Sequence, residues 1–187
     1  MAQSRIFMFK TSGLAFAIIL VLTACAQSTS AQRYGIGRPA TVTEVAGWNI
    51  DARADGAGLP AASGSVRQGR SIYEDKCAAC HGAKGEGGPG PRLVGGYGTL
   101  TAASPVLSVG SFWPYATTLY DYINRAMPFD QPQSLTPAQV YAVTAYTLRL
   151  NGIVGEDAVL DQSSLPAIEM PNRRGFSSPD PRPDTHR

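Results

Sequence analysis

The stretch Cys77-Ala78-Ala79-Cys80-His81 places two thiols and one imidazole within a single short segment. It has the form C-x-x-C-H, which is the attachment signature of a c-type haem. Two thiols at this spacing can add across the two vinyl groups of one porphyrin, and the adjacent histidine then supplies the proximal ligand of the iron. We therefore predict that Cys77, Cys80 and His81 hold one covalently bound haem c.

Two other uses of a C-x-x-C pair fit the chain less well. A redox-active disulfide of this type sits in a thioredoxin-like setting, which the sequence does not have. A zinc site needs further ligands. The only other cysteine is Cys25, in an export signal, and the only other histidine is His186, in a polar tail. Neither is placed to complete a zinc site.

Residues 1–26 have the pattern of an export signal. Two basic residues precede an apolar run over 14–22, which is short for a membrane span and is followed by small residues. We therefore expect a bacterial periplasmic protein, since haem c is attached after export. Residues 22–25 look like a lipobox that would make Cys25 a lipid anchor, whereas cleavage at the A-x-A site over 24–26 would discard Cys25. Both alternatives stay open.

Length and charge narrow the class of protein. The 187 residues allow one domain with decorated ends, and the formal net charge of +2 gives no basic field for nucleic acid. With two histidines, the chain offers no Ser/His/Asp catalytic set. The glycine run after His81 lacks the Lys-Ser or Lys-Thr of a phosphate-binding loop.

The chain is predicted to divide into four segments. Residues 1–26 form the signal, and 27–63 form an irregular arm with one short strand over 40–45. The arm either packs on the domain or docks on a partner. Residues 64–152 form the haem domain. Residues 153–187 form a C-terminal extension whose end is expected to be disordered.

Three helices are predicted in the haem domain. The first begins at Val66, after a capping box of Ser65 and Gln68, and runs into the haem motif. The second covers about 115–125, with an apolar stripe of Leu119, Tyr122 and Ile123. The third, about 137–151, is marked by a second capping box and is apolar on most of its surface. The pattern predicts an all-α fold around one haem.

There are four possibilities for the second axial position of the iron. Met127 follows a helix and precedes a proline in a structured loop, so it is the favoured ligand. Met170, in the C-terminal extension, is an alternative thioether. A lysine ligand or a five-coordinate iron would leave Met127 merely packing on the ring. A thioether would raise the reduction potential relative to two nitrogen ligands.

Residues 64–152 resemble a class I monohaem cytochrome c. The resemblance implies the class I cytochrome c fold, in which three or more helices surround the haem. In that fold the first and last helices cross, and a glycine of one packs against an aromatic ring of the other. It also implies that the Pro91 carbonyl accepts the Nδ1–H of His81 and fixes the ring plane. Arg92 would either pair with a haem propionate or remain a surface arginine. The matching features are Gly69, Tyr73, the haem motif, Gly90-Pro91-Arg92-Leu93 as the family's G-P-x-L, Met127-Pro128 and Tyr146.

The flanks resemble a narrower group, the cytochrome c subunits of molybdenum sulfite or sulfane dehydrogenases. This resemblance implies a subunit that accepts electrons one at a time from a molybdenum subunit, which oxidises an inorganic sulfur species. Another cytochrome or a terminal oxidase would be the acceptor. It also favours partner docking for the arm. The matching stretches are 37–41, 48–51, 56–60, 141–146, 150–154, 165–166 and 170–172.

Three functions follow from these observations. The leading one is the electron-transfer subunit of such a dehydrogenase, in which substrate oxidation takes place on another subunit. The second is a free-standing electron shuttle, which has no need of its flanks and should work without them. The third is a haem enzyme or gas sensor, which needs an open iron site and therefore excludes ligation by Met127.

Overall fold

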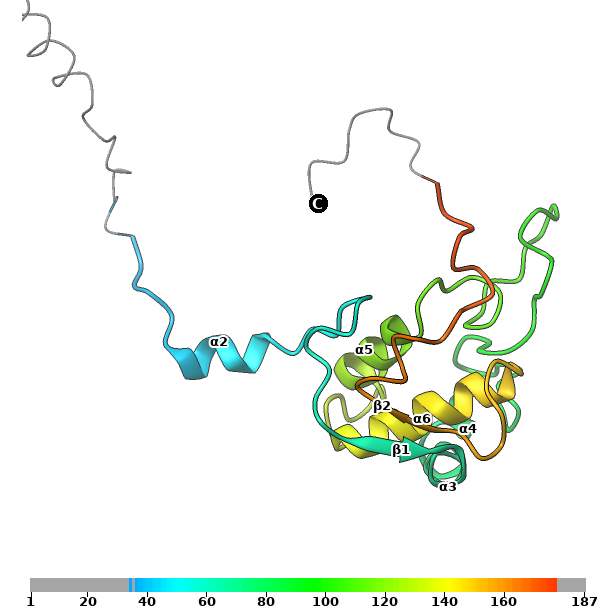
Figure 1. Ribbon diagram of the computed structural model, residues 1–187, viewed down its shortest axis with the longest axis horizontal. Helices are drawn as coiled ribbons and strands as arrows, with labels where there is room; N and C mark the ends of the chain where they lie inside the picture. The colour runs from blue at the N-terminus through cyan, green and yellow to red at the C-terminus, as the bar shows by residue number, and fades with distance from the viewer. Residues whose placement is uncertain (1–33, 35, 178–187) are drawn as a thin grey trace, which may run out of the picture. The chain divides into compact units, whose positions relative to one another are not determined.

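The computed structural model describes residue 34 and residues 36–177. The chain separates into two units, Met1–Thr41 and Val42–Arg187. The helices and strands labelled in Figure 1 belong to the second unit. The predicted export signal, Cys25 and His186 lie outside the described residues. Within the described ranges, no helix has both the length and the apolar character needed to cross a membrane.

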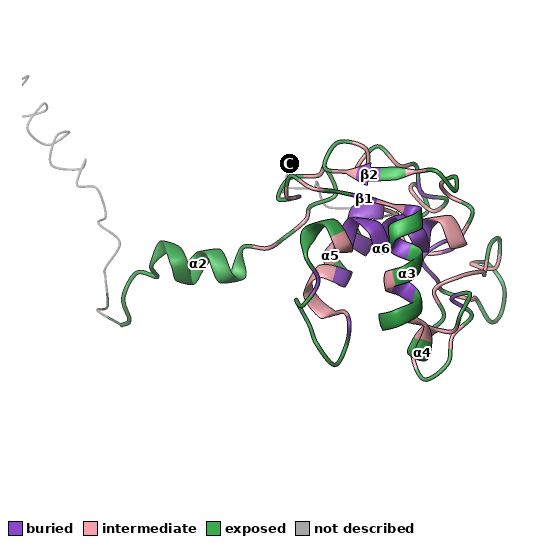
Figure 2. Ribbon diagram, turned by 90° about the horizontal axis from the view of Figure 1, so that it is seen from below, coloured by how far each residue is buried: buried purple, intermediate pink, exposed green. Residues whose placement is uncertain are grey.

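The second unit is mostly helical, as predicted. Its two short strands pair with each other and lie far apart in the sequence. Figure 2 shows α6 as the most deeply buried helix. In chain order the elements are α2 (Val42–Trp48), β1 (Ser63–Ser65), α3 (Val66–Lys76), α4 (Ala78–His81), α5 (Ala116–Ala126), α6 (Pro137–Leu150) and β2 (Val159–Asp161).

Both predicted capping boxes are present. The Ser65 hydroxyl accepts the Gln68 amide at 3.2 Å, and the Gln68 side chain accepts the Ser65 amide at 2.9 Å. Thr136 and Gln139 make the same reciprocal pair at the start of α6. Each box satisfies two backbone amides that a helix start otherwise leaves unpaired. These local bonds fix where the two main helices of the domain begin.

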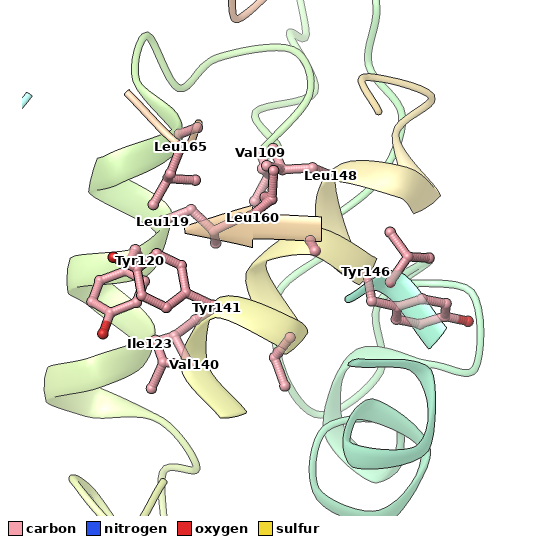
Figure 3. Close-up of a cluster of buried hydrophobic side chains, with 14 of the residues drawn as sticks. Val109, Leu119, Tyr120, Ile123, Val140, Tyr141, Tyr146, Leu148, Leu160 and Leu165 are labelled. Atoms are coloured by element: carbon pink, nitrogen blue, oxygen red, sulfur yellow. The ribbon is translucent and has the colours of Figure 1, made fainter. Parts of the chain in front are cut away.

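The predicted apolar stripe of α5 is partly wrong. Leu119 and Ile123 are buried, but Tyr122 is half exposed and meets Trp113 edge to face, with ring centroids 5.8 Å apart. Tyr120 is buried instead, because its ring packs on Tyr141 of α6 with centroids 4.6 Å apart. Figure 3 shows these two rings side by side between α5 and α6.

The strand predicted over 40–45 is also wrong, because this stretch opens the helix α2. A run of β-branched residues forms a strand only where a neighbouring strand can pair with it, and none of the described strands reaches this segment. Thr41 and Glu44 have the spacing of a capping box, and Glu44 lies in the first turn. That local signal indicates a helix start.

The C-terminal extension is an integral part of the haem domain. Strand β2 pairs antiparallel with β1, and Gly64 lies opposite Leu160. Leu160, Leu165 and Met170 are at most 4% exposed and belong to the hydrophobic core. Removing the extension would expose this core, so truncating the flanks cannot separate an electron shuttle from a dehydrogenase subunit.

We expect Asp161→Asn to weaken the fold at neutral pH. The Asp161 carboxylate accepts bonds from the amides and hydroxyls of Ser163 and Ser164, and these bonds hold its pKa well below the usual range. A lowered carboxyl pKa stabilises the fold above the unfolded-state pKa of about 4, and the gain is lost as the pH falls further. Thermal unfolding from pH 7 to pH 3 should therefore show a lower Tm for the variant at pH 7. The difference from the parent should shrink below pH 4, and a constant difference would contradict this account.

Candidate haem-binding site

A single turn of helix brings the two cysteines and the histidine together. Cys77 ends α3 and starts α4, and its carbonyl accepts the amide of His81 at 2.9 Å. Cys77 is half-buried and Cys80 is exposed, and both are free thiols. Burial raises the pKa of the Cys77 thiol to about 11. The two thiols are thus held on the same short helix as the imidazole that follows them.

The loop after His81 fixes the orientation of the imidazole. Its Nδ1 lies 2.7 Å from the carbonyl oxygen of Pro91. A carbonyl can only accept, so Nδ1 carries the proton and Nε2 keeps a free lone pair for a metal. Gly90 leaves room for the ring, since its amide donates to the Cys80 carbonyl at 2.8 Å and a Cβ at this position would lie 3.0 Å from Cε1 of His81.

These residues fit a covalently bound haem c. The site supplies two thiols at the attachment spacing, and it supplies one imidazole whose metal-binding nitrogen is free and whose other nitrogen is held by a carbonyl. Among the described residues, no group of three or more His, Cys, Asp or Glu side chains is placed to hold a metal ion. The two thiols and the oriented imidazole therefore suit a porphyrin iron.

Arg92 is held by the same loop. Its Nε donates to the carbonyl of Glu86 at 3.2 Å, and its side chain is exposed. Glu86 accepts the amide of Lys84 at 2.7 Å, and bonds from its own amide and that of Lys84 lower the pKa of its carboxyl group. Pairing of Arg92 with a haem propionate stays a prediction.

The two candidate methionines occupy different environments. Met127 is the C-cap of α5, where its amide donates to the carbonyl of Ile123 at 3.1 Å, and its side chain is half-buried against the core. Met170 is 1% exposed and lies inside the core. Ligation by Met170 would require this part of the core to open, and ligation of the iron by Met127 stays a prediction.

Helices α3 and α6 cross at the residues that the sequence picks out. Gly69 lies against the backbone of Ala142, and the rings of Tyr73 and Tyr146 pack with centroids 5.3 Å apart. The hydroxyl of Tyr73 donates to the carbonyl of Gly82 at 2.9 Å, directly after His81. This bond, which could not be predicted from the sequence, connects the helix crossing to the loop that follows His81.

A second support missed from the sequence is Asn151. Its side-chain amide donates to the carbonyls of Leu93 at 3.1 Å and of Thr147 at 2.9 Å. It thereby joins the end of α6 to the segment that follows Pro91. An asparagine at a helix end is equally typical of a simple cap, so its type alone does not reveal this role.

We expect Gly90→Ala to raise the reduction potential of the haem by an amount on the order of tens of millivolts. The added Cβ would lie 3.0 Å from Cε1 and 3.1 Å from Nδ1 of His81, so the ring or the loop must give by a few tenths of an ångström, and we expect the bond to Pro91 to weaken. A weaker bond makes the imidazole less electron-rich, which favours Fe(II). Potentiometric titration measures the effect. Gly155→Ala is the control, because its Cβ would meet nothing within 4 Å, and an equal shift there would contradict the prediction.

Comparison with known proteins identifies the family. The cytochrome c family model matches residues 66–151. Among solved structures, the chain is similar to one in the crystal structure of the sulfane dehydrogenase SoxCD from Paracoccus pantotrophus. The two share 42% sequence identity with a TM-score of 0.74, and the match covers 82% of this chain and 76% of that chain. No curated protein sequence matches the chain. With its C-x-x-C-H motif on α4 and its helical fold, the chain belongs to the cytochrome c family and is a monohaem protein with covalently bound haem c.

Proposed function

We propose that this cytochrome is the haem subunit of a periplasmic sulfur dehydrogenase and accepts electrons from a molybdenum-containing subunit. The observation that carries the proposal is the extent of the similarity to the sulfane dehydrogenase. The match covers 82% of 187 residues, about 153, whereas the family model spans only 66–151. Even if every residue after 151 is matched, roughly thirty of the matched residues must precede residue 66. The similarity therefore extends beyond the residues that the family model matches, into the part of the chain that precedes residue 66.

The residues of the site have defined tasks in this function. Cys77 and Cys80 would bind the haem covalently, and His81 and Met127 would fill both axial positions. The haem, when bound, supplies an iron that cycles between Fe(III) and Fe(II). The carbonyl of Pro91 keeps the proton on Nδ1 of His81 and so helps to set the potential. If His81 and Met127 both bind the iron, no position on it would be left for a substrate, and sulfur oxidation would take place on the partner.

The arm is proposed to dock on that partner. Helix α2 has no buried residue, and Val42 and Trp48 are 87% and 85% exposed. Val42, Val45 and Trp48 recur at three-residue spacing, so they lie along one side of the helix. An apolar stripe of this kind is costly to leave in water, and laying it in a groove of a partner is a common way to recognise a helix.

Co-purification from the native periplasm tests the proposal. The cytochrome should copurify with a second subunit and stoichiometric molybdenum, and sulfite or a reduced sulfur compound should reduce its haem in that complex. Electrons would then pass to another cytochrome or to a terminal oxidase. A lone monohaem protein that only ascorbate or unrelated partners reduce would overturn the proposal and leave the free-standing shuttle.

Alanine at Val42 and Trp48 should weaken the complex while the absorption spectrum of the haem stays unchanged.

A further inference from the structure

Three charged side chains connect the arm to helix α5. Asp121 accepts the amide of Ala52 at 2.8 Å through one carboxylate oxygen, and Nε of Arg125 at 2.8 Å through the other. The Nη2 of Arg125 also pairs with the carboxylate of Asp51. One guanidinium therefore bridges a carboxylate of the arm and a carboxylate of the helix. We call the group formed by Asp51, the Ala52 amide, Asp121 and Arg125 the arm clasp.

The clasp holds a folded part of the arm. A Cβ on Gly58 would lie 1.9 Å from the carbonyl oxygen of Asp51, so the chain closes tightly on itself over 51–58. Leu59, which follows, is buried, and the hydroxyl of Tyr141 donates to the carbonyl of Pro60 at 3.1 Å. Asp51 thus lies between the exposed helix α2 and residues 59–60, which are held on the haem domain.

The α5 side of the clasp is next to Met127, the proposed ligand of the haem iron. Arg125 lies in the last turn of α5, and Met127 is the C-cap of the same helix. The amide of Met127 donates to the carbonyl of Ile123, which is buried in the core. Because a hydrogen-bonded helical turn moves nearly as a unit, a displacement of Arg125 carries the backbone of Met127 with it.

We propose that Arg125 is a positioning residue that transmits docking of the arm through the clasp to Met127, so that the reduction potential of the haem responds to partner binding. The inference rests on the proposed function and on ligation by Met127. When a partner holds α2, the chain that leads into Asp51 is immobilised. The clasp then limits the movement of Met127 and keeps its thioether on the iron. Firmer thioether ligation favours Fe(II). By linkage, the reduced cytochrome must bind the partner more tightly by the same factor.

The experiment compares the reduction potential of the free, haem-loaded full chain with its potential in the complex with the copurified dehydrogenase subunit. The variants are Arg125→Gln, which removes the bridge, and Asp51→Asn, which removes the charge of its arm end at a side chain that is 67% exposed. The matched control is Arg149→Gln, since Arg149 is similarly exposed and pairs with Glu156 at 2.7 Å, outside the clasp.

The parent and the Arg149→Gln control should show a rise on binding equivalent to at least a threefold change in the reduction equilibrium, about 28 mV at 59 mV per tenfold. In the two clasp variants the change should stay below about 1.5-fold, or 10 mV. The free variants should keep the long-wavelength absorption band of thioether-ligated ferric haem, which separates lost coupling from lost ligation. If Arg125→Gln does not fold, Asp51→Asn decides.

Three outcomes overturn the inference. These are a shift in the clasp variants as large as that of the parent, loss of the shift in the control together with the clasp variants, and formation of the complex without any shift in the parent. Failure to form a complex at all would instead overturn the proposed function, and absence of the thioether band in the free parent would overturn ligation by Met127. Each failure is therefore distinguishable from the others.

Discussion

Met127→Ala is expected to abolish the long-wavelength absorption band of thioether-ligated ferric haem and to lower the reduction potential by about 0.1 to 0.3 V, a fraction of the roughly 0.8 V over which axial ligands act. The thioether stabilises Fe(II) relative to water or a nitrogen ligand, so its loss favours Fe(III). The haem should stay attached, because Cys77 and Cys80 are unchanged. Visible absorption, potentiometric titration and a denaturing haem assay measure the three effects.

The control for this variant is Met170→Leu. Met170 is 1% exposed in the core, and leucine preserves its volume, so the cost in stability should stay below about 1.5 kcal/mol. The absorption band and the potential should be those of the parent. If Met170→Leu loses the band and Met127→Ala keeps it, the assignment of the ligand is reversed. If the parent itself lacks the band, an open or lysine-ligated site replaces both methionines as the explanation.

Features that depend on a few neighbouring residues could be predicted from the sequence. The haem motif needs only its own spacing, and the capping boxes at Ser65 and Thr136 are closed by residues three positions away. Helix α6 is indicated in the sequence by a proline in its first turn and by apolar residues on most of its surface. The helical fold and the covalently bound haem c followed from these signals and from the family resemblance.

Features that depend on distant residues could not be predicted in this way. The pairing of β1 with β2 joins Ser65 to Val159 across the whole domain, and each strand has only three residues. Strands this short carry no periodicity of their own, so only the tertiary contact identifies them. The burial of Leu165 and Met170 likewise depends on how the extension returns to the core.

The same limit applies to the candidate site. Arg125 and Asp121 are four residues apart on one helix, so their ion pair is readable as a local contact. Their contact with Asp51 and Ala52, about seventy positions earlier, is not. The contribution of the structure is therefore to show that the arm and the end of α5 are joined, which gives the arm a physical connection to Met127.

Gly69→Ala is expected to destabilise the fold by about 3 kcal/mol or more, although alanine is the better helix former by about 1 kcal/mol. A Cβ at this position would lie 1.9 Å from the carbonyl oxygen of Ala142 and 2.9 Å from the Cβ of Tyr146. The nearer atom is backbone of α6, so no side-chain rotation relieves the clash, and α3 must move away from α6. Denaturant unfolding followed by circular dichroism measures the loss.

The displacement of α3 from α6 should also reduce haem incorporation. Tyr73 lies one turn after Gly69, packs on Tyr146 and holds the carbonyl of Gly82 beside the haem motif. We therefore expect the Gly69→Ala protein to incorporate less haem as well as to unfold more easily. Gly47→Ala is the matched control, a helical glycine in α2 whose Cβ would meet nothing within 4 Å. It should leave the unfolding midpoint unchanged, and an equal loss in both variants would show that helix geometry at the crossing is not the cause.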